Sequence, residues 1–250
     1  GLKSIFNYYS SLFSTLNDKT VLIKPNFNTA DPPPASTDIN IIKEIIMHLK
    51  YIKVNKIIVA ERSGPADSYE TIKTKGLFDL EKEVGGFEIL NLASMDNSQW
   101  KKYESKNSHW KDGFLYPKVL DEVDAIITLP CLKTHQFGGH FTMSLKLSVG
   151  FVPRDGYTYM KELHSSPHQR EMIAEINACY TPSLIIMDGM TAFVDGGPSR
   201  GTEVQVNLML ASIDRIAIDA VGVAILRSLG TTSEVSSGSI FNQDQIARAI

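Results

Sequence analysis

The chain has 250 residues, of which 43% are hydrophobic and 21% charged, and its formal net charge is −3 at pH 7. This composition supports a substantial core in one large domain, and we expect a single domain over residues 1–250. A slightly acidic chain is not expected to coat nucleic acid, because proteins that do so are normally basic. The two cysteines, Cys131 and Cys179, cannot supply a disulfide framework, a four-cysteine zinc site or a self-contained iron–sulfur cluster.

No apolar run approaches the roughly 18 residues that cross a bilayer, so we predict a cytoplasmic protein that has no membrane partner. The chain begins with Gly1 instead of Met, and we expect either a processed start or a boundary within a longer protein. Residues 242–250 have the pattern of a helix that is only beginning, and we expect the natural protein to continue beyond residue 250.

Short apolar runs alternate with helical patterns along the first third of the chain. Apolar residues spaced by three and four over 2–16 predict an amphipathic helix, and the run at 20–23 predicts a buried strand. A proline-rich loop follows, after which Thr37 or Asp38 is expected to cap a helix. The inner face of that helix is predicted to carry four apolar residues: Ile42, Ile45, Ile46 and Leu49.

The same alternation continues to the end of the chain. Strands are predicted at 56–60, 125–129, 183–187 and 204–210, and helices at 142–149, 166–179 and 214–229. Residues 94–114 are polar and aromatic without a clear period, so we interpret them as an irregular excursion. The glycine-rich stretch 196–201 is expected to connect two strands as a hairpin. Strands that alternate with helices predict an α/β fold with a mostly parallel, doubly wound open sheet and helices on both faces.

Polar side chains directly follow the predicted strands. These tails are Lys24-Pro25-Asn26, Glu61-Arg62-Ser63-Gly64, Lys133-Thr134-His135 and Asp188-Gly189. In a parallel sheet the carboxyl ends of the strands share one edge, where ligands bind in a crevice. We therefore expect the four tails to form one site, although solvated strand ends would have the same sequence pattern.

The cations among these residues predict a site for a small anionic metabolite. Lys24, Lys133 and Lys146 can hold a carboxylate or phosphate as point charges. Further contacts are expected from three polar residues, Asn26, Thr134 and Arg200. The alternative for each lysine is a side chain that lies in water.

Two residues are candidates for proton transfer. His135 is the first, because the pKa of histidine is easily placed near physiological pH, although a lone histidine is often a hydrogen-bonded structural residue. Glu61 is the second, and its structural alternative is an ion pair with Arg62. Glu61 and Asp188 together could hold Mg²⁺, which prefers oxygen ligands, and we treat this cofactor as optional.

Several short motifs resemble a family of uncharacterised bacterial and archaeal proteins, the domain of unknown function family 362. They are Ile23-Lys24-Pro25-Asn26, Leu129 to His135, Ser144-Leu145-Lys146, Asp188-Gly189 with Gly197-Pro198, and Ala211 to Ala220. Their order and number extend the resemblance over most of the chain, from about residue 20 to 229. Relatives often carry a ferredoxin-like four-iron module, which implies redox partners. This chain departs from them, because it lacks the cysteines for such clusters and has Cys131 where relatives usually have a basic residue.

Two hypotheses for the function follow. The first is an enzyme that acts on a small anionic metabolite in the crevice formed by the lysine, histidine, glutamate and aspartate side chains. The second is a non-catalytic binding module, or an accessory partner of an iron–sulfur or redox protein. The second hypothesis predicts a shallow crevice and an exposed apolar surface near Trp100 and Trp110.

Overall fold

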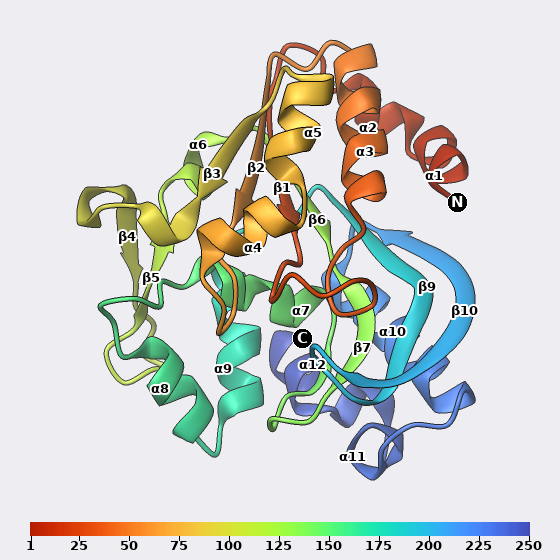
Figure 1. Cartoon of the computed structure of the whole chain (residues 1–250). Coiled ribbons are helices and arrows are strands. Elements are labelled where there is room, and N and C mark those ends of the chain that lie inside the picture. Colours follow the sequence, from red (N-terminus) through yellow and green to blue (C-terminus); the bar gives the residue numbers. More distant parts are fainter.

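Strand β1 (Thr20–Pro25) divides its apolar side chains between two cores, because successive residues of a strand point to opposite faces of the sheet. Val21 and Ile23 pack into one hydrophobic cluster and Leu22 into another. The computed structural model describes residues 1–250, and in it β1 lies in the middle of a mixed, mostly parallel sheet of eight strands with helices on both faces (Figure 1). This architecture confirms the predicted α/β fold class.

The strands lie in the order β3-β2-β1-β6-β9-β7-β8, and β10 pairs with β9. Besides β1, the sheet contains β2 (Lys56–Glu61), β3 (Glu88–Asn91), β6 (Ala125–Leu129), β7 (Cys131–His135), β8 (His140–Thr142), β9 (Leu184–Gly196) and β10 (Gly201–Ser212). Only the β7–β8 and β9–β10 pairs of this sheet are antiparallel. Strands β4 (Trp100–Tyr103) and β5 (Phe114–Pro117) form a separate antiparallel pair.

Helices from the first third of the chain cover one face of the sheet. They are α1 (Leu2–Tyr8), α2 (Ser10–Ser14), α3 (Ile39–Tyr51), α4 (Ser68–Thr74) and α5 (Leu77–Val84). The predicted inner face of α3 is confirmed, because its four apolar residues are fully buried. Asp38 caps this helix by accepting a hydrogen bond from the Asn40 amide, whereas the Thr37 hydroxyl donates to the Leu129 carbonyl oxygen.

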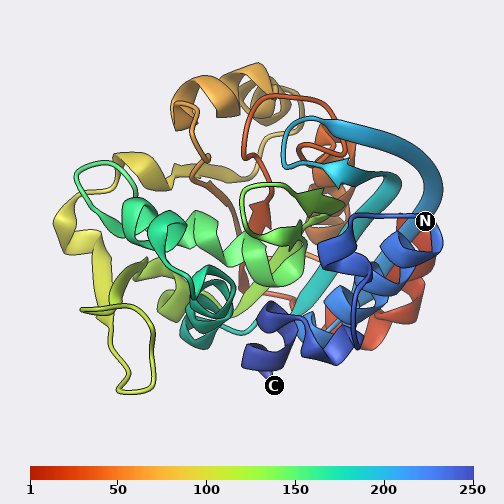
Figure 2. The same cartoon turned by 90° about the horizontal axis from the view of Figure 1, so that it is seen from below.

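The remaining helices come from residues 119–249 of the chain. They are α6 (Val119–Glu122), α7 (Ser144–Leu147), α8 (Tyr159–Ser165), α9 (Gln169–Ile176), α10 (Arg215–Ser228), α11 (Ser233–Ser236) and α12 (Asp244–Ala249). In the view from below, the blue C-terminal helices lie at the opposite side of the molecule from the yellow β4–β5 segment (Figure 2). None of the helices combines the length and the apolar character that crossing a bilayer requires.

Residues 94–114 are more regular than predicted. They include β4 and the start of β5, and both tryptophans of this segment are core residues: Trp100 is 6% exposed and Trp110 is 3% exposed. Trp100 packs under the sheet with Leu22 and Ile58. The exposed apolar surface that the accessory-partner hypothesis predicts around these tryptophans is therefore absent.

Three boundaries near the predicted site differ from the sequence prediction. The sequence pattern predicts a polar tail after the strand at 125–129, but these residues form a strand of their own, β7, which contains Lys133, Thr134 and His135. Strand β9 does not end at Asp188 but continues to Gly196, because β10 pairs with it beyond that point. The predicted helix over 142–149 is reduced to the short α7 followed by a 3₁₀ turn, and Thr142 ends β8. The hairpin connection at 196–201 is confirmed.

Candidate functional site

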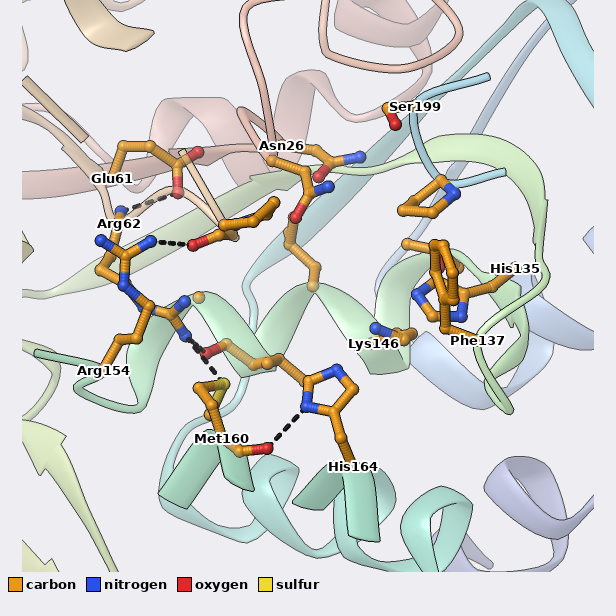
Figure 3. Close-up of a pocket in the computed structure, with 18 of the residues that line it drawn as sticks. Asn26, Glu61, Arg62, His135, Phe137, Lys146, Arg154, Met160, His164 and Ser199 are labelled. Atoms are coloured by element: carbon orange, nitrogen blue, oxygen red, sulfur yellow. Dashed lines mark hydrogen bonds between the residues drawn. The ribbon is translucent and has the colours of Figure 1, made fainter. Parts of the chain in front are cut away.

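A cavity of about 720 Å³ lies at the carboxyl ends of β1, β2 and β7. Residues of α7, of α8 and of the β9–β10 hairpin complete its lining (Figure 3). The chain thus brings together tails of three strands that are far apart in the sequence, as expected for the carboxyl edge of a parallel sheet.

The lining carries an excess of positive charge. It contains four side chains that are cationic in their ordinary protonation states, Lys24, Arg62, Lys146 and Arg154, and a single carboxylate, that of Glu61. An anion that enters the cavity therefore meets a positive field, which is stronger in a partly desolvated site than in bulk water.

We call the side formed by Lys24, Asn26, Glu61 and Arg62 the β1–β2 wall. Its centre is a buried ion pair in which Lys24 Nζ donates to Glu61 Oε1 at 2.5 Å. Lys24 Nζ also donates to the Pro25 carbonyl oxygen at 2.7 Å.

The Glu61 carboxylate has further partners in the backbone. The amides of Phe27 and Arg62 donate to it at 2.8 Å each. Burial lowers the pKa of Lys24, and the neighbouring Glu61 carboxylate opposes that shift.

The two arginines of the lining hold backbone carbonyl groups. Arg62 donates to the carbonyl oxygens of Ser63 and Val149, and burial lowers its pKa to about 10. Arg154 donates to the carbonyl oxygens of Gly64 and Ala66 and pairs with the exposed Asp155. These bonds fix the loop after β2, so the arginines contribute charge to the cavity from fixed positions.

We call the opposite side, formed by His135, Thr142 and Lys146, the α7–β7 wall. Lys146 has no hydrogen bond and no salt bridge, unlike the lysine on the β1–β2 wall, and its pKa is lowered to about 7 by burial and by the positive charges of Lys133 and Arg62. Lys146 and His135 lie beside each other (Figure 3). A Cβ at Gly139 would come within 2.8 Å of His135 Nδ1 and 2.9 Å of Lys146 Cε, so this glycine permits their close approach.

His135 is buried and neutral at physiological pH. Burial and the positive charges of Lys146 and Lys133 place its pKa well below the usual range of histidine. Its Nδ1 atom has no hydrogen-bond partner although it is buried. A neutral imidazole with a free ring nitrogen can accept or relay a proton.

Helix α7 is held in place by a residue from a distant part of the chain. Asp219 of α10 accepts hydrogen bonds from the backbone amides of Ser144 at 2.7 Å and Leu145 at 2.9 Å. These bonds satisfy the free amides at the start of α7, which carries Lys146. Burial raises the pKa of Asp219 to about 7, and the two amide donors favour its charged form.

Unpaired polar atoms gather around the cavity. Buried side-chain atoms without a hydrogen-bond partner include four from the lining: Asn26 Nδ2, Arg62 Nε, His135 Nδ1 and Thr142 Oγ1. Buried polar groups are normally paired, because an unsatisfied donor or acceptor costs about 1–3 kcal/mol. The lining therefore offers several donors and acceptors to a polar ligand.

Five of the predicted site residues line this cavity: Lys24, Asn26, Glu61, His135 and Lys146. The roles assigned to them remain predictions. Four other predicted residues do not line it. Lys133 Nζ is buried and donates to the carbonyl oxygens of Ala35 at 2.5 Å and Pro198 at 3.0 Å. Thr134 donates to the Phe193 carbonyl oxygen at 3.3 Å, and Arg200 is exposed on the β9–β10 hairpin.

The two carboxylates predicted to hold Mg²⁺ are not brought together at the cavity. Glu61 lines it, whereas Asp188 lies within the longer strand β9 and accepts a hydrogen bond from the Met190 amide at 3.0 Å. No group of three or more histidine, cysteine, aspartate or glutamate side chains is arranged to hold a metal ion. Magnesium at this pair is therefore a prediction that the arrangement of the lining does not support.

Other lining residues were not predicted as ligand-binding residues. Arg62 had a signal in the sequence, because it directly follows Glu61 at the end of a strand. Thr142 was assigned to a helix, and the exposed His164 of α8 was not predicted as a site residue. Arg154 comes from a segment without a regular pattern, so nothing in the sequence indicated its position.

Comparisons with known proteins identify relatives of the chain. The family model described as a domain of unknown function, DUF362, matches residues 21–224. The "Thylakoid-associated protein sll1697" from Synechocystis sp. is 26% identical over 212 residues, which cover 83% of this chain and 63% of that protein. The chain thus spans less than two thirds of the length of this relative.

Two solved structures resemble the fold. A crystal structure of a protein from Thermotoga maritima has a TM-score of 0.60 at 11% identity, over 91% of this chain and 59% of that one. The lactate racemase apoprotein from Thermoanaerobacterium thermosaccharolyticum has a TM-score of 0.44 at 13% identity, over 83% of this chain and 49% of that one. The first likeness supports the α/β fold and says nothing about activity.

Proposed function

The chain belongs to the DUF362 family, and we propose that this member is an enzyme that binds a small carboxylate or phosphate between the β1–β2 wall and the α7–β7 wall. One observation carries the proposal. The cavity lining has three cationic side chains, Lys24, Arg62 and Arg154, against one carboxylate, and it also has the Lys146 amine, which has no partner within the protein.

The unpaired groups of the lining support this proposal. A bound carboxylate or phosphate would accept hydrogen bonds from the free Asn26 Nδ2 and Arg62 Nε donors and from Lys146 when it is protonated. Charges and dipoles that are fixed before the ligand arrives also stabilise negative charge that develops during a reaction.

His135 is the residue we propose for proton transfer. Its neutral imidazole has a free Nδ1 atom beside Lys146, and no acidic partner holds the ring in its protonated form. The Glu61 carboxylate already accepts hydrogen bonds from Lys24 and from two backbone amides, so in our proposal it orients the β1–β2 wall.

The accessory-partner hypothesis has less support. It predicts a shallow crevice and an exposed apolar surface near Trp100 and Trp110, whereas the cavity has a volume of about 720 Å³ and both tryptophans are buried. A redox partner protein and a cytoplasmic location remain predictions that no feature of the site favours.

Anion binding can be measured directly by titration calorimetry with inorganic phosphate and with acetate at about pH 6, where Lys146 is mostly protonated. We expect Lys146→Gln to weaken binding at least about tenfold, which corresponds to about 1.4 kcal/mol. Lys3→Gln is the matched control, because it removes the same charge from an exposed position of α1 outside the cavity lining.

The native protein should also unfold at a higher temperature when an anion binds, since a ligand at about 100 times its Kd adds about 2.7 kcal/mol. Absence of both heat and thermal stabilisation with phosphate and acetate would contradict the proposal. Equal binding by the Lys146→Gln and native proteins would place the anion outside this cavity.

A further inference from the structure

Three buried or partly buried lysines near the cavity differ in what their amines contact. Lys24 is bonded to the Glu61 carboxylate and the Pro25 carbonyl oxygen. Lys133 is bonded to two carbonyl oxygens. Lys146 has neither a hydrogen bond nor an ion pair, and it alone of the three has no neighbouring negative group that raises its pKa.

We propose that Lys146 is an amine nucleophile, which forms an imine with the carbonyl carbon of an anionic aldehyde or ketone such as a 2-oxo acid. This inference rests on the proposed function, because anion binding would bring the carbonyl group to the amine. It adds a substrate class to the site and changes the role of Lys146 from a counter-ion to a reacting group.

The surroundings of Lys146 favour the neutral amine that the reaction needs. Burial of the side chain and the positive charges of Lys133 and Arg62 all disfavour the ammonium form, and they place its pKa at about 7. Lysines activated in proteins commonly owe their reactivity to such desolvation and to neighbouring cations. The amine is reachable from solvent, because it lines an open cavity.

The proposed step needs no oxidant, reductant or further reactant. The Lys146 Nζ lone pair forms a bond to the carbonyl carbon, and the π bond of the carbonyl group breaks as its oxygen takes up a proton. The nitrogen then loses a proton, the hydroxyl group leaves as water after protonation, and a C=N double bond forms. The neutral His135, whose Nδ1 atom is unpaired and whose ring lies beside Lys146, is positioned to carry these protons.

Reductive trapping tests the proposal. The native protein is incubated with glyoxylate and sodium cyanoborohydride at about pH 7, and the product is analysed by intact mass and peptide mapping. About half of Lys146 is neutral at this pH, whereas less than about 0.1% of an ordinary lysine is. We therefore expect the main lysine adduct on the peptide that contains Lys146, formed at least about 100 times faster than adducts at exposed lysines with an ordinary pKa.

Two variants distinguish a reaction at Lys146 from reactions at exposed lysines. Lys146→Arg keeps a positive charge but has no amine, and we expect it to lose the fast adduct. Lys3→Arg makes the same change at an exposed lysine of α1, and we expect it to react as the native protein does. Mapping on the native chain keeps the test valid even if the Lys146→Arg protein does not fold.

The outcome also separates this inference from the proposed function. A native protein that binds phosphate but gives adducts scattered over many lysines would overturn the imine and leave anion binding intact. A native protein that neither binds phosphate nor gives the Lys146 adduct would overturn both. An adduct on Lys146 that excess phosphate suppresses would support both.

Discussion

Each of the two walls of the cavity contains a lysine, and the two lysines differ in what their amines contact. On the β1–β2 wall, Lys24 is paired with Glu61, and this carboxylate also accepts two backbone amide hydrogen bonds. On the α7–β7 wall, Lys146 has no partner, and the neighbouring His135 and Thr142 each have an unpaired buried atom.

This difference distinguishes groups that stabilise the fold from groups that are free to bind a ligand within the same cavity. A buried ion pair whose hydrogen bonds are complete is a rigid part of the fold, and it has little capacity left for a ligand. Unpaired groups reduce stability, but they are available to a ligand. We therefore expect substitutions of the ion-paired Lys24 and Glu61 to affect folding, and substitutions of the unpaired Lys146 and His135 to affect binding.

The largest expected effect is at the ion pair. Lys24→Met leaves the buried Glu61 carboxylate without its cation, and we expect the free energy of unfolding to fall by about 3–5 kcal/mol. The measurement is urea unfolding at about pH 7. The double variant with Glu61→Gln removes both charges and should recover much of the loss. If Lys24→Met is as stable as the native protein, the ion pair of the β1–β2 wall does not stabilise the fold.

An intermediate effect is expected from the pH dependence of stability. The folded-state pKa values of Lys146 and Lys133 are lowered to about 7 and about 8, while an unfolded lysine titrates near pH 10.4. Between these values the unfolded chain binds more protons, so stability should rise with pH, by about 3–4 kcal/mol from about pH 7 to pH 9.

Lys146→Met should flatten part of this rise, because it removes one of the two groups, whereas Lys3→Met should not change it. Unfolding curves at several pH values measure the slope. A slope that Lys146→Met leaves unchanged would mean that the Lys146 ammonium is not destabilised in the folded protein.

The smallest effect is expected at a hydroxyl group of the α7–β7 wall. Thr142→Val removes a buried Oγ1 atom that has no partner, and we expect the stability to stay the same or rise by about 0.5 kcal/mol. Thr134→Val is the matched control, since its hydroxyl donates to the Phe193 carbonyl oxygen, and it should cost about 1 kcal/mol. Unfolding in urea ranks the two variants, and the reverse order would contradict the conclusion that the Thr142 hydroxyl group is unpaired.

Much of the β1–β2 wall could be predicted from the sequence because its signals are local. Strands β1 and β2 are continuous apolar runs, and the polar residues that end them, Lys24 and Glu61, follow within one or two positions. The parallel arrangement of the strands then places both residues at one edge.

The rest of the site depends on contacts that local patterns do not encode. Asp188-Gly189 looks like the end of a strand, but pairing with β10 carries β9 further to Gly196. Lys133 has the charge expected of a ligand-binding residue, but its amine is turned to the backbone of the loop after β1 and of the hairpin. Arg154 reaches the lining from an irregular segment, and only the folded chain reveals this position.

The contact between Asp219 and the start of α7 has a consequence for how the protein matures. It joins residues 75 positions apart, so the helix that carries Lys146 is anchored only after α10 has been synthesised and docked. A nascent chain that stops before this point can already contain β1, β2 and β7. It would nevertheless lack a fixed Lys146, and the α7–β7 wall would therefore be completed late in biosynthesis.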